Sequence, residues 1–157
     1  FGLKDGEFKN WGTNQRMSNI HGAVLLGQIR RIKEIVNDRI AKAKIYNELL
    51  SDIKGIQIPK IKLDAISNYQ TYAVFLDKDG IRDKVIEEMG KRKIQTQIGT
   101  YALHATPYFN DTIKIGDLNN SYRLFKNLLA LPLHFALTCS DQKSVVNSLE
   151  EILSDLM

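Results

Sequence analysis

The stretch YQTYAVFLDKDGIRDKVIEEMGKR, residues 69–92, joins an aromatic, apolar segment to an amphipathic one across a turn sequence. Residues 69–76 are rich in aromatic and β-branched side chains, which is typical of a strand. The tetrapeptide DKDG, residues 77–80, predicts a turn, because Asp and Gly adopt turn conformations readily. Residues 81–92 then predict a helix, with apolar side chains at helical spacing: Ile81, Val85, Ile86 and Met89. The stretch therefore predicts a strand that leads directly into a helix.

A long amphipathic helix is predicted before this unit, from Met17 to about Ile53. This segment contains no proline, and its apolar residues recur on one stripe. Its first part, residues 20–29, is apolar on nearly all sides, so we expect it to be more deeply buried than the rest. Gly22 and Gly27 permit a bend, so either one helix or two would fit the pattern.

Further elements are predicted after the strand–helix unit. Residues 94–103 alternate in a way that suits a second strand ending at Gly99. A helix is expected over residues 119–130, and a proline favours an extended segment over residues 131–134. Ser140 is a good N-cap for a final helix, whose apolar face would consist of Val145, Val146, Leu149, Ile152 and Leu153. The order predicts an α+β fold: a long N-terminal helix, continuous or broken, and a small sheet packed with helices.

Composition indicates one globular domain. The 157 residues are 43% hydrophobic and 25% charged, and no apolar run in the sequence is long enough to span a bilayer. The single cysteine fits a reducing compartment, so we expect a cytoplasmic protein. The net charge of +4 is dispersed, which argues against a nucleic-acid-binding domain. The three histidines lie far apart and show no spacing typical of metal ligands, so no metal site is predicted.

The first candidate site lies in GTNQRM, residues 12–17. Asn14 and Arg16 precede the long helix, where free backbone N–H groups and the helix dipole favour an anion. An amide and a guanidinium there would complete a phosphate site. The alternative is structural: Asn14 or Ser18 caps the helix, and Arg16 pairs with an acidic neighbour.

The second candidate site is the loop GTYALHATPYF, residues 99–109, which follows the second predicted strand. It carries Tyr101, His104 and Tyr108 close together. Aromatic and imidazole groups on a loop suit the binding of a polar ring or a diphosphate, and a loop packed for structural reasons is the alternative.

Three segments together resemble the pyridoxal-phosphate-dependent sugar aminotransferases of the DegT/StrS type. They are WGTNQRMSNIHGAVLLGQIRRIKEIVNDRIAKAKIYNELL (11–50), KIQTQIGTYALH (93–104) and LALPLHFALTCSD (129–141). The first contains the family's G-x-N-x-R-M motif, the second its I-x-T-x-x-x-Y-x-x-x-H, and the third its L-x-L-P-x-x-x-x-L-T-x-x-D. The likeness runs from about residue 10 to the end. Lys93 stands where the family often has glycine, and Gly99–Thr100 replace a commoner histidine.

The resemblance implies that this chain is the C-terminal part of such an enzyme. Residues 1–16 would then be a loop with a phosphate-contacting motif, and residues 17–157 the small domain of the aminotransferase fold. The large N-terminal domain, which carries the Schiff-base lysine, would be absent. No residue of this chain is therefore expected to be catalytic, and the fragment alone is expected to be inactive.

The resemblance also implies roles for four residues. Asn14 would bind the phosphate of pyridoxal 5'-phosphate across a homodimer, with Arg16 in the same environment or bracing the loop. Tyr101 and His104 would lie near the nucleotide-sugar pocket. The full-length enzyme would transfer an amino group from glutamate to a nucleotide-linked keto sugar, with no nucleic acid or membrane as partner. The alternative is a stand-alone small-molecule-binding or regulatory module derived from this domain.

Overall fold

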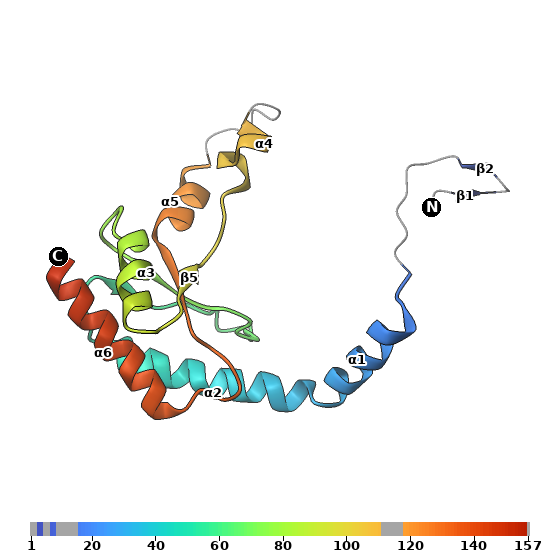
Figure 1. The fold of residues 1–157 in the computed structure, drawn as a ribbon, viewed down its shortest axis with the longest axis horizontal. Coiled ribbons are helices and arrows are strands. Elements are labelled where there is room, and N and C mark those ends of the chain that lie inside the picture. Colours follow the sequence, from blue (N-terminus) through green and yellow to red (C-terminus); the bar gives the residue numbers. More distant parts are fainter. Residues whose placement is uncertain (1–2, 5–6, 9–15, 111–117, 157) are drawn as a thin grey trace. The chain divides into compact units, whose positions relative to one another are not determined.

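A computed structural model describes residues 3–4, 7–8, 16–110 and 118–156. The chain divides into two compact units, residues 1–34 and residues 35–157. The predicted α+β class is confirmed: helices accompany a small antiparallel sheet (Figure 1).

The first unit contains a short antiparallel pair and a helix. Strand β1 (Leu3–Lys4) pairs with β2 (Glu7–Phe8). Helix α1 (Asn19–Arg30) follows Ser18, whose hydroxyl accepts a hydrogen bond of 3.3 Å from the backbone N–H of His21. Ser18 is therefore the N-cap, as one of the two structural alternatives predicts.

The predicted long helix is two helices. A turn at Arg31 separates α1 from α2 (Ile32–Leu50). The backbone N–H of Arg31 bonds the carbonyl of Gln28 at 3.0 Å, which closes the last turn of α1. The break therefore lies beyond Gly22 and Gly27, at a residue that the sequence does not mark.

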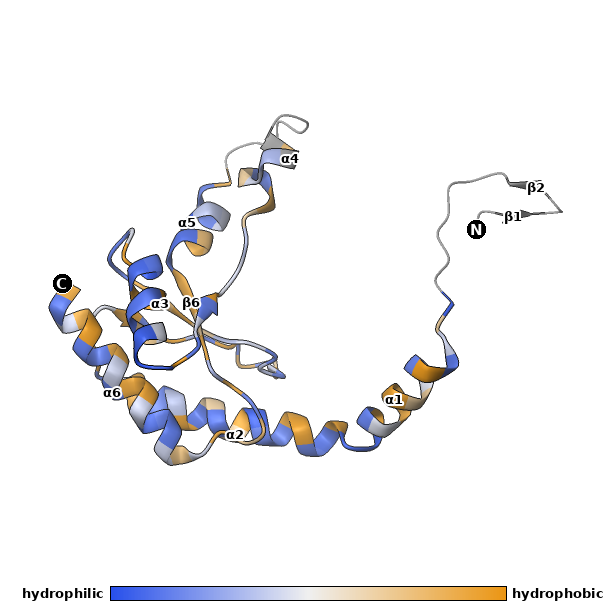
Figure 2. Ribbon diagram, viewed as in Figure 1, coloured by the Kyte–Doolittle hydropathy of each residue, from blue (hydrophilic) through white to orange (hydrophobic). Residues whose placement is uncertain are grey.

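Helix α1 buries none of its residues within this chain. Ile20, Val24, Leu26 and Ile29 are exposed by 76%, 61%, 54% and 63%, and Figure 2 shows hydrophobic residues along the helix. The expectation that residues 20–29 are the most deeply buried part is therefore wrong for this chain. The apolar pattern indicates that the helix needs a partner and does not say that the partner lies in the same chain.

The second unit is built on a four-stranded antiparallel sheet in the order β3-β4-β6-β5. The predicted strand of residues 69–76 is β4 (Tyr72–Leu76), which lies in the interior of the sheet. Strand β3 (Ile56–Gln57) flanks it, and β5 (Gln97–Ile98) forms the other edge.

Strand β6 (Leu128–Leu131) corrects the prediction of a helix over residues 119–130. Helix α5 ends at Asn127, and the next residues pair with β4 on one side and β5 on the other. A short apolar run has the same periodicity signal in a buried strand as at the end of a helix. Pairing with two strands decides in favour of the strand.

Helices α2, α3 (Arg82–Lys91) and α6 (Cys139–Leu156) share one core with the sheet. Alternate residues of β4 enter it. The helix predicted over residues 81–92 is α3, and the predicted apolar face of the last helix is buried. The fully buried side chains of this core include Tyr46, Leu50, Tyr72, Val74, Leu76, Val85, Met89, Leu129, Leu149 and Leu153.

Helix α6 begins one residue before Ser140, so that serine is not its N-cap. Thr138 has this role: its hydroxyl accepts from the N–H of Asp141 at 3.1 Å, and the carboxylate of Asp141 accepts from the N–H of Thr138 at 2.8 Å. This reciprocal arrangement is a capping box. The sequence offered two hydroxyl residues in three positions, and the structure uses the earlier one.

Lys93 ends α3 in a left-handed backbone conformation, with φ of 62°. Its N–H bonds the carbonyl of Gly90 at 2.9 Å, and the N–H of Ile94 bonds the carbonyl of Met89 at 3.0 Å. These two bonds form a Schellman motif, whose left-handed position favours glycine. The geometry accounts for the glycine that the resembled family often has at this position.

No helix in the described ranges is both long and apolar enough to cross a membrane.

Candidate functional site

The site begins where the chain leaves β5. The N–H of Gly99 donates to the carbonyl of Leu128 at 2.9 Å, which extends the β5–β6 pairing by one bond. Two residues later, Tyr101 is 64% exposed. The 3-10 helix η1 (Leu103–Ala105) follows and carries His104, which is half-buried. Tyr108 lies in the short helix α4 (Pro107–Asn110).

Tyr101 and His104 belong to one row of rings, formed with two residues of α5 (Asn119–Asn127). The ring centroids of Tyr101 and Phe125 are 6.0 Å apart, and those of Phe125 and Tyr122 are 6.3 Å apart. The ring of His104 lies 6.4 Å from that of Tyr122. The four residues, called the aromatic row below, thus bring both sequence-predicted substrate residues to one surface.

Cations flank the aromatic row. The Lys126 ammonium lies 5.5 Å from the ring centroid of Tyr122 and 5.7 Å from that of Phe125. The guanidinium of Arg82 lies 5.4 Å from the ring of Phe125. Helix α5 has the sequence NNSYRLFKN and carries no acidic residue. Aromatic faces next to uncompensated cations on α5 suit a ligand that is both flat and anionic.

Two buried side chains hold α5 in place. Arg82 is 4% exposed, donates to the carboxylate of Asp83 at 2.6 Å and also donates to the backbone carbonyl of Phe125. The amide of Asn127 donates to the carbonyl of Leu76 at 2.9 Å and to Asp79 at 2.6 Å. The rings of α5 are therefore presented on a fixed element.

Sequence reasoning missed the α5 half of the row. Tyr122, Phe125 and Lys126 stand three and four positions apart, which places them on one helix face. This spacing was the available signal. It pointed to no ligand until η1 supplied the facing rings.

A hollow of about 450 Å³ adjoins Tyr101. The hydroxyl of Thr96, which stands in the I-x-T motif, is buried there without a hydrogen-bond partner among the described residues. Such groups are rare in folded proteins. The hollow is lined by Asp83, Ile86, Thr96, Gln97, Ile98 and Tyr101.

The other two predicted site residues belong to the first unit. Asn14 lies outside the described residues. Arg16 is exposed, two residues before the Ser18 cap. The first N–H groups of α1, at Asn19 and Ile20, have no acceptor within the helix. The phosphate role of Asn14 and Arg16 thus stays a prediction.

The comparisons with known proteins agree with the resemblance. The model of the DegT/DnrJ/EryC1/StrS aminotransferase family matches residues 3–150. An uncharacterised protein of Methanocaldococcus jannaschii, MJ1066, is 28% identical over 92% of this chain. The dTDP-4-dehydro-2,3,6-trideoxy-D-glucose 4-aminotransferase of Saccharopolyspora spinosa is 30% identical over 79% of it. The crystal structure of the aminotransferase TlmJ from Streptoalloteichus hindustanus superposes with a TM-score of 0.84 at 26% identity, covering 96% of this chain.

The chain is much shorter than these proteins. It spans 39% of the archaeal protein, 31% of the Saccharopolyspora enzyme and 40% of TlmJ. The family model nevertheless covers nearly all of it. The chain belongs to the DegT/DnrJ/EryC1/StrS aminotransferase family.

Proposed function

We propose that this chain is the C-terminal part of a pyridoxal-phosphate-dependent aminotransferase that transfers an amino group from glutamate to a nucleotide-linked keto sugar. The observation that carries this proposal is the aromatic row with its flanking cations, in a chain of this family. The protein would act in the cytoplasm, as a homodimer.

The aromatic row fits the nucleotide end of such a substrate. A base has a flat face that can stack on Tyr101 or Tyr122, and Lys126 stands beside the rings to pair with a phosphate. His104, at the end of the row, would face the sugar. Because a neutral imidazole both donates and accepts hydrogen bonds, it can bind a sugar hydroxyl.

The start of α1 fits the phosphate of the cofactor. The free N–H groups of Asn19 and Ile20 lie at the positive end of the helix dipole. Arg16 adds a cation, and Asn14 would add an uncharged amide donor. When bound, pyridoxal phosphate supplies the electron sink for amino transfer. This chain would supply phosphate binding and part of the sugar pocket, and on its own it would not transaminate.

Separate kinetic effects on the two substrates test the proposal in the full-length enzyme. We expect His104→Ala and Lys126→Ala to raise KM for the nucleotide sugar by about tenfold, and to leave KM for glutamate within twofold. Lys44→Ala is the matched control, because Lys44 is exposed on α2 away from the row. Equal effects on both substrates would remove the row from the sugar side.

The cofactor role of Asn14 has a separate readout. Asn14→Ala should weaken retention of pyridoxal phosphate by about tenfold to a hundredfold, because a hydrogen bond to a charged acceptor contributes about 1.5–3 kcal/mol. Dialysis followed by absorbance of the retained cofactor measures this loss. Unchanged retention would contradict the assignment.

A further inference from the structure

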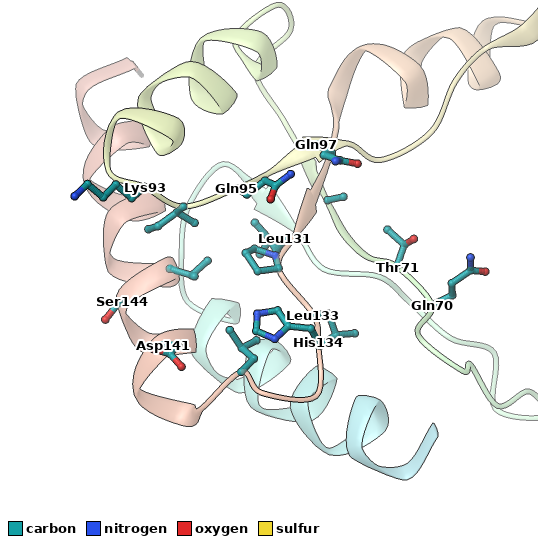
Figure 3. Close-up of a pocket in the computed structure, with 15 residues that line it drawn as sticks. Gln70, Thr71, Lys93, Gln95, Gln97, Leu131, Leu133, His134, Asp141 and Ser144 are labelled. Carbon is teal, nitrogen blue, oxygen red and sulfur yellow. The ribbon is translucent and has the colours of Figure 1, made fainter. Parts of the chain in front are cut away.

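A second pocket, of about 610 Å³, lies at the end of β6 that is opposite to α5 (Figure 3). Residues 93–97, which lead into β5, form one side of it, and residues 131–134, which leave β6, form another. The start of α6 and residues 70–71 complete the lining. The aromatic row does not contribute to this pocket.

The opening follows from the sequence. Strands β5 and β6 pair only at Gln97↔Ala130 and Ile98↔Leu129. Continued in the same register, the next inward pair would bring Gln95 opposite Pro132, which has no N–H to donate. The two chains therefore part, and a hollow remains between them.

The rim of the pocket is polar and uncharged. The side chains of Gln70, Gln95, Gln97 and His134 line it, and among the described residues none of them makes a hydrogen bond within the chain. Figure 3 shows Gln95 and His134 on facing sides, while the side chain of Lys93 extends away from both. The rest of the lining is largely apolar: Ile94, Ala130, Leu131, Pro132, Leu133, Leu137 and Val145.

The one acidic group of the pocket is already engaged. The carboxylate of Asp141 accepts from the N–H of Thr138 at 2.8 Å and from its hydroxyl at 2.6 Å. It is therefore held at the N-terminus of α6. What the pocket offers a ligand is a set of amides and an imidazole.

Buried residues of α2 fix the loop that carries His134. The ammonium of Lys42, a residue that is only 8% exposed, donates to the carbonyl of His134 at 3.0 Å and to that of Phe135 at 2.6 Å. The hydroxyl of Tyr46 donates to the carbonyl of Pro132 at 3.0 Å. The pocket wall is thus preformed, which lowers the entropy that a ligand would lose on binding.

We propose that this pocket binds the ring of a neutral carbohydrate. Amide groups donate and accept hydrogen bonds together, as vicinal hydroxyl groups do, and three glutamines surround the opening. The C–H face of a sugar ring would pack against the apolar lining. The volume lies within the range of small-molecule sites. This site is separate from the aromatic row and does not depend on the activity proposed above.

Amide chemical shifts of the 157-residue chain test the proposal. The probes are methyl β-D-glucoside, methyl β-D-galactoside and N-acetylglucosamine, with inorganic phosphate as the anionic probe. We expect at least one sugar to shift the signals of Gln95, Gln97 and His134 in a saturable manner in the millimolar range. No saturable shift with any of the three sugars, or a shift with phosphate alone, would overturn the proposal.

Two variants test whether the glutamines make the contacts. Gln95→Leu and Gln97→Leu replace exposed side chains, and each should weaken binding of the sugar by about tenfold. Gln28→Leu, at an exposed glutamine on α1, is the matched control and should leave the affinity unchanged. Equal affinity in all three variants would also overturn the proposal.

Discussion

A Cβ added at Gly99 would lie 2.7 Å from the Cβ of Leu128 and 3.2 Å from that of Ala73. The end of β5 therefore approaches the neighbouring strands more closely than a side chain permits. We expect Gly99→Ala to lower the free energy of unfolding by about 1–3 kcal/mol, the usual cost of overpacking. Chemical denaturation measures the change.

Gly90→Ala is the control for this prediction. A Cβ at Gly90 would meet no atom within 4 Å, and the residue lies in α3. Because alanine is the better helix former, Gly90→Ala should raise stability by about 0.5–1 kcal/mol. A similar loss in both variants would show that the contact at Gly99 is not the cause.

Lys93 offers a stabilising substitution. Its φ of 62° lies in the left-handed region, which costs a side-chain-bearing residue about 1 kcal/mol. We therefore expect Lys93→Gly to raise the melting temperature. Lys91→Gly, two residues earlier and inside α3, should lower it, because glycine is a poor helix former. The prediction fails if both variants are destabilised alike.

The buried ammonium of Lys42 joins α2 to the loop after β6. It donates to Asp38 at 2.7 Å as well as to the carbonyls of His134 and Phe135. Lys42→Met keeps the length of the stem and leaves these acceptors without their donor. We expect a loss of roughly 1.5–3 kcal/mol in the free energy of unfolding. Lys44→Met, at an exposed position of α2, should change stability by less than about 0.5 kcal/mol.

The elements that sequence reasoning predicted best have a strong local signal. Strand β4 is aromatic and β-branched, and α3 and α6 repeat apolar residues at helical spacing. The errors lie where long-range contacts decide. Strand β6 is set by its two partners, and the break at Arg31 has no marker in the sequence.

The site shows the same division. The loop with Tyr101 and His104 was predicted because its residue types are unusual for a loop. Phe125 and Lys126 were not predicted, because a helix sequence does not tell which element faces it. The role of Lys42 could not be predicted either, since its acceptors lie more than 90 residues away in the chain.

The capping box of α6 predicts a dependence of stability on pH. Hydrogen bonds from the hydroxyl and the N–H of Thr138 hold the pKa of Asp141 below its ordinary value of 3.8. The charged carboxylate therefore stabilises the folded state above that pH, and this contribution is lost as the pH falls through the lowered pKa. Asp141→Asn should thus be less stable than the unchanged chain at pH 7, and the difference should shrink in acid.

Denaturation series between neutral pH and pH values below 3.8 measure this difference. Thr138→Val removes the hydroxyl donor and should weaken the pH dependence while leaving Asp141 in place. A stability difference that stays constant across the series would contradict the assigned role of the carboxylate.

The exposed apolar surface of α1 predicts self-association of this chain. Ile20, Val24, Leu26 and Ile29 each expose more than half of their surface. In the proposed full-length enzyme, a further domain or a second subunit would cover them. Without such a cover, two copies of the chain can bury this surface against each other, which contributes about 25 cal/mol for each Å² of apolar area removed from water. A two-fold pair is the commonest closed arrangement.

Light scattering coupled to size exclusion at micromolar concentration measures the association. Leu26→Glu places a charge in the middle of the apolar surface of α1 and should shift the chain to a monomer. Leu63→Glu makes the same change at an exposed leucine outside α1 and should leave the association intact. An unchanged chain that elutes as a monomer, or equal disruption by both variants, would show that α1 is not the surface through which copies pair.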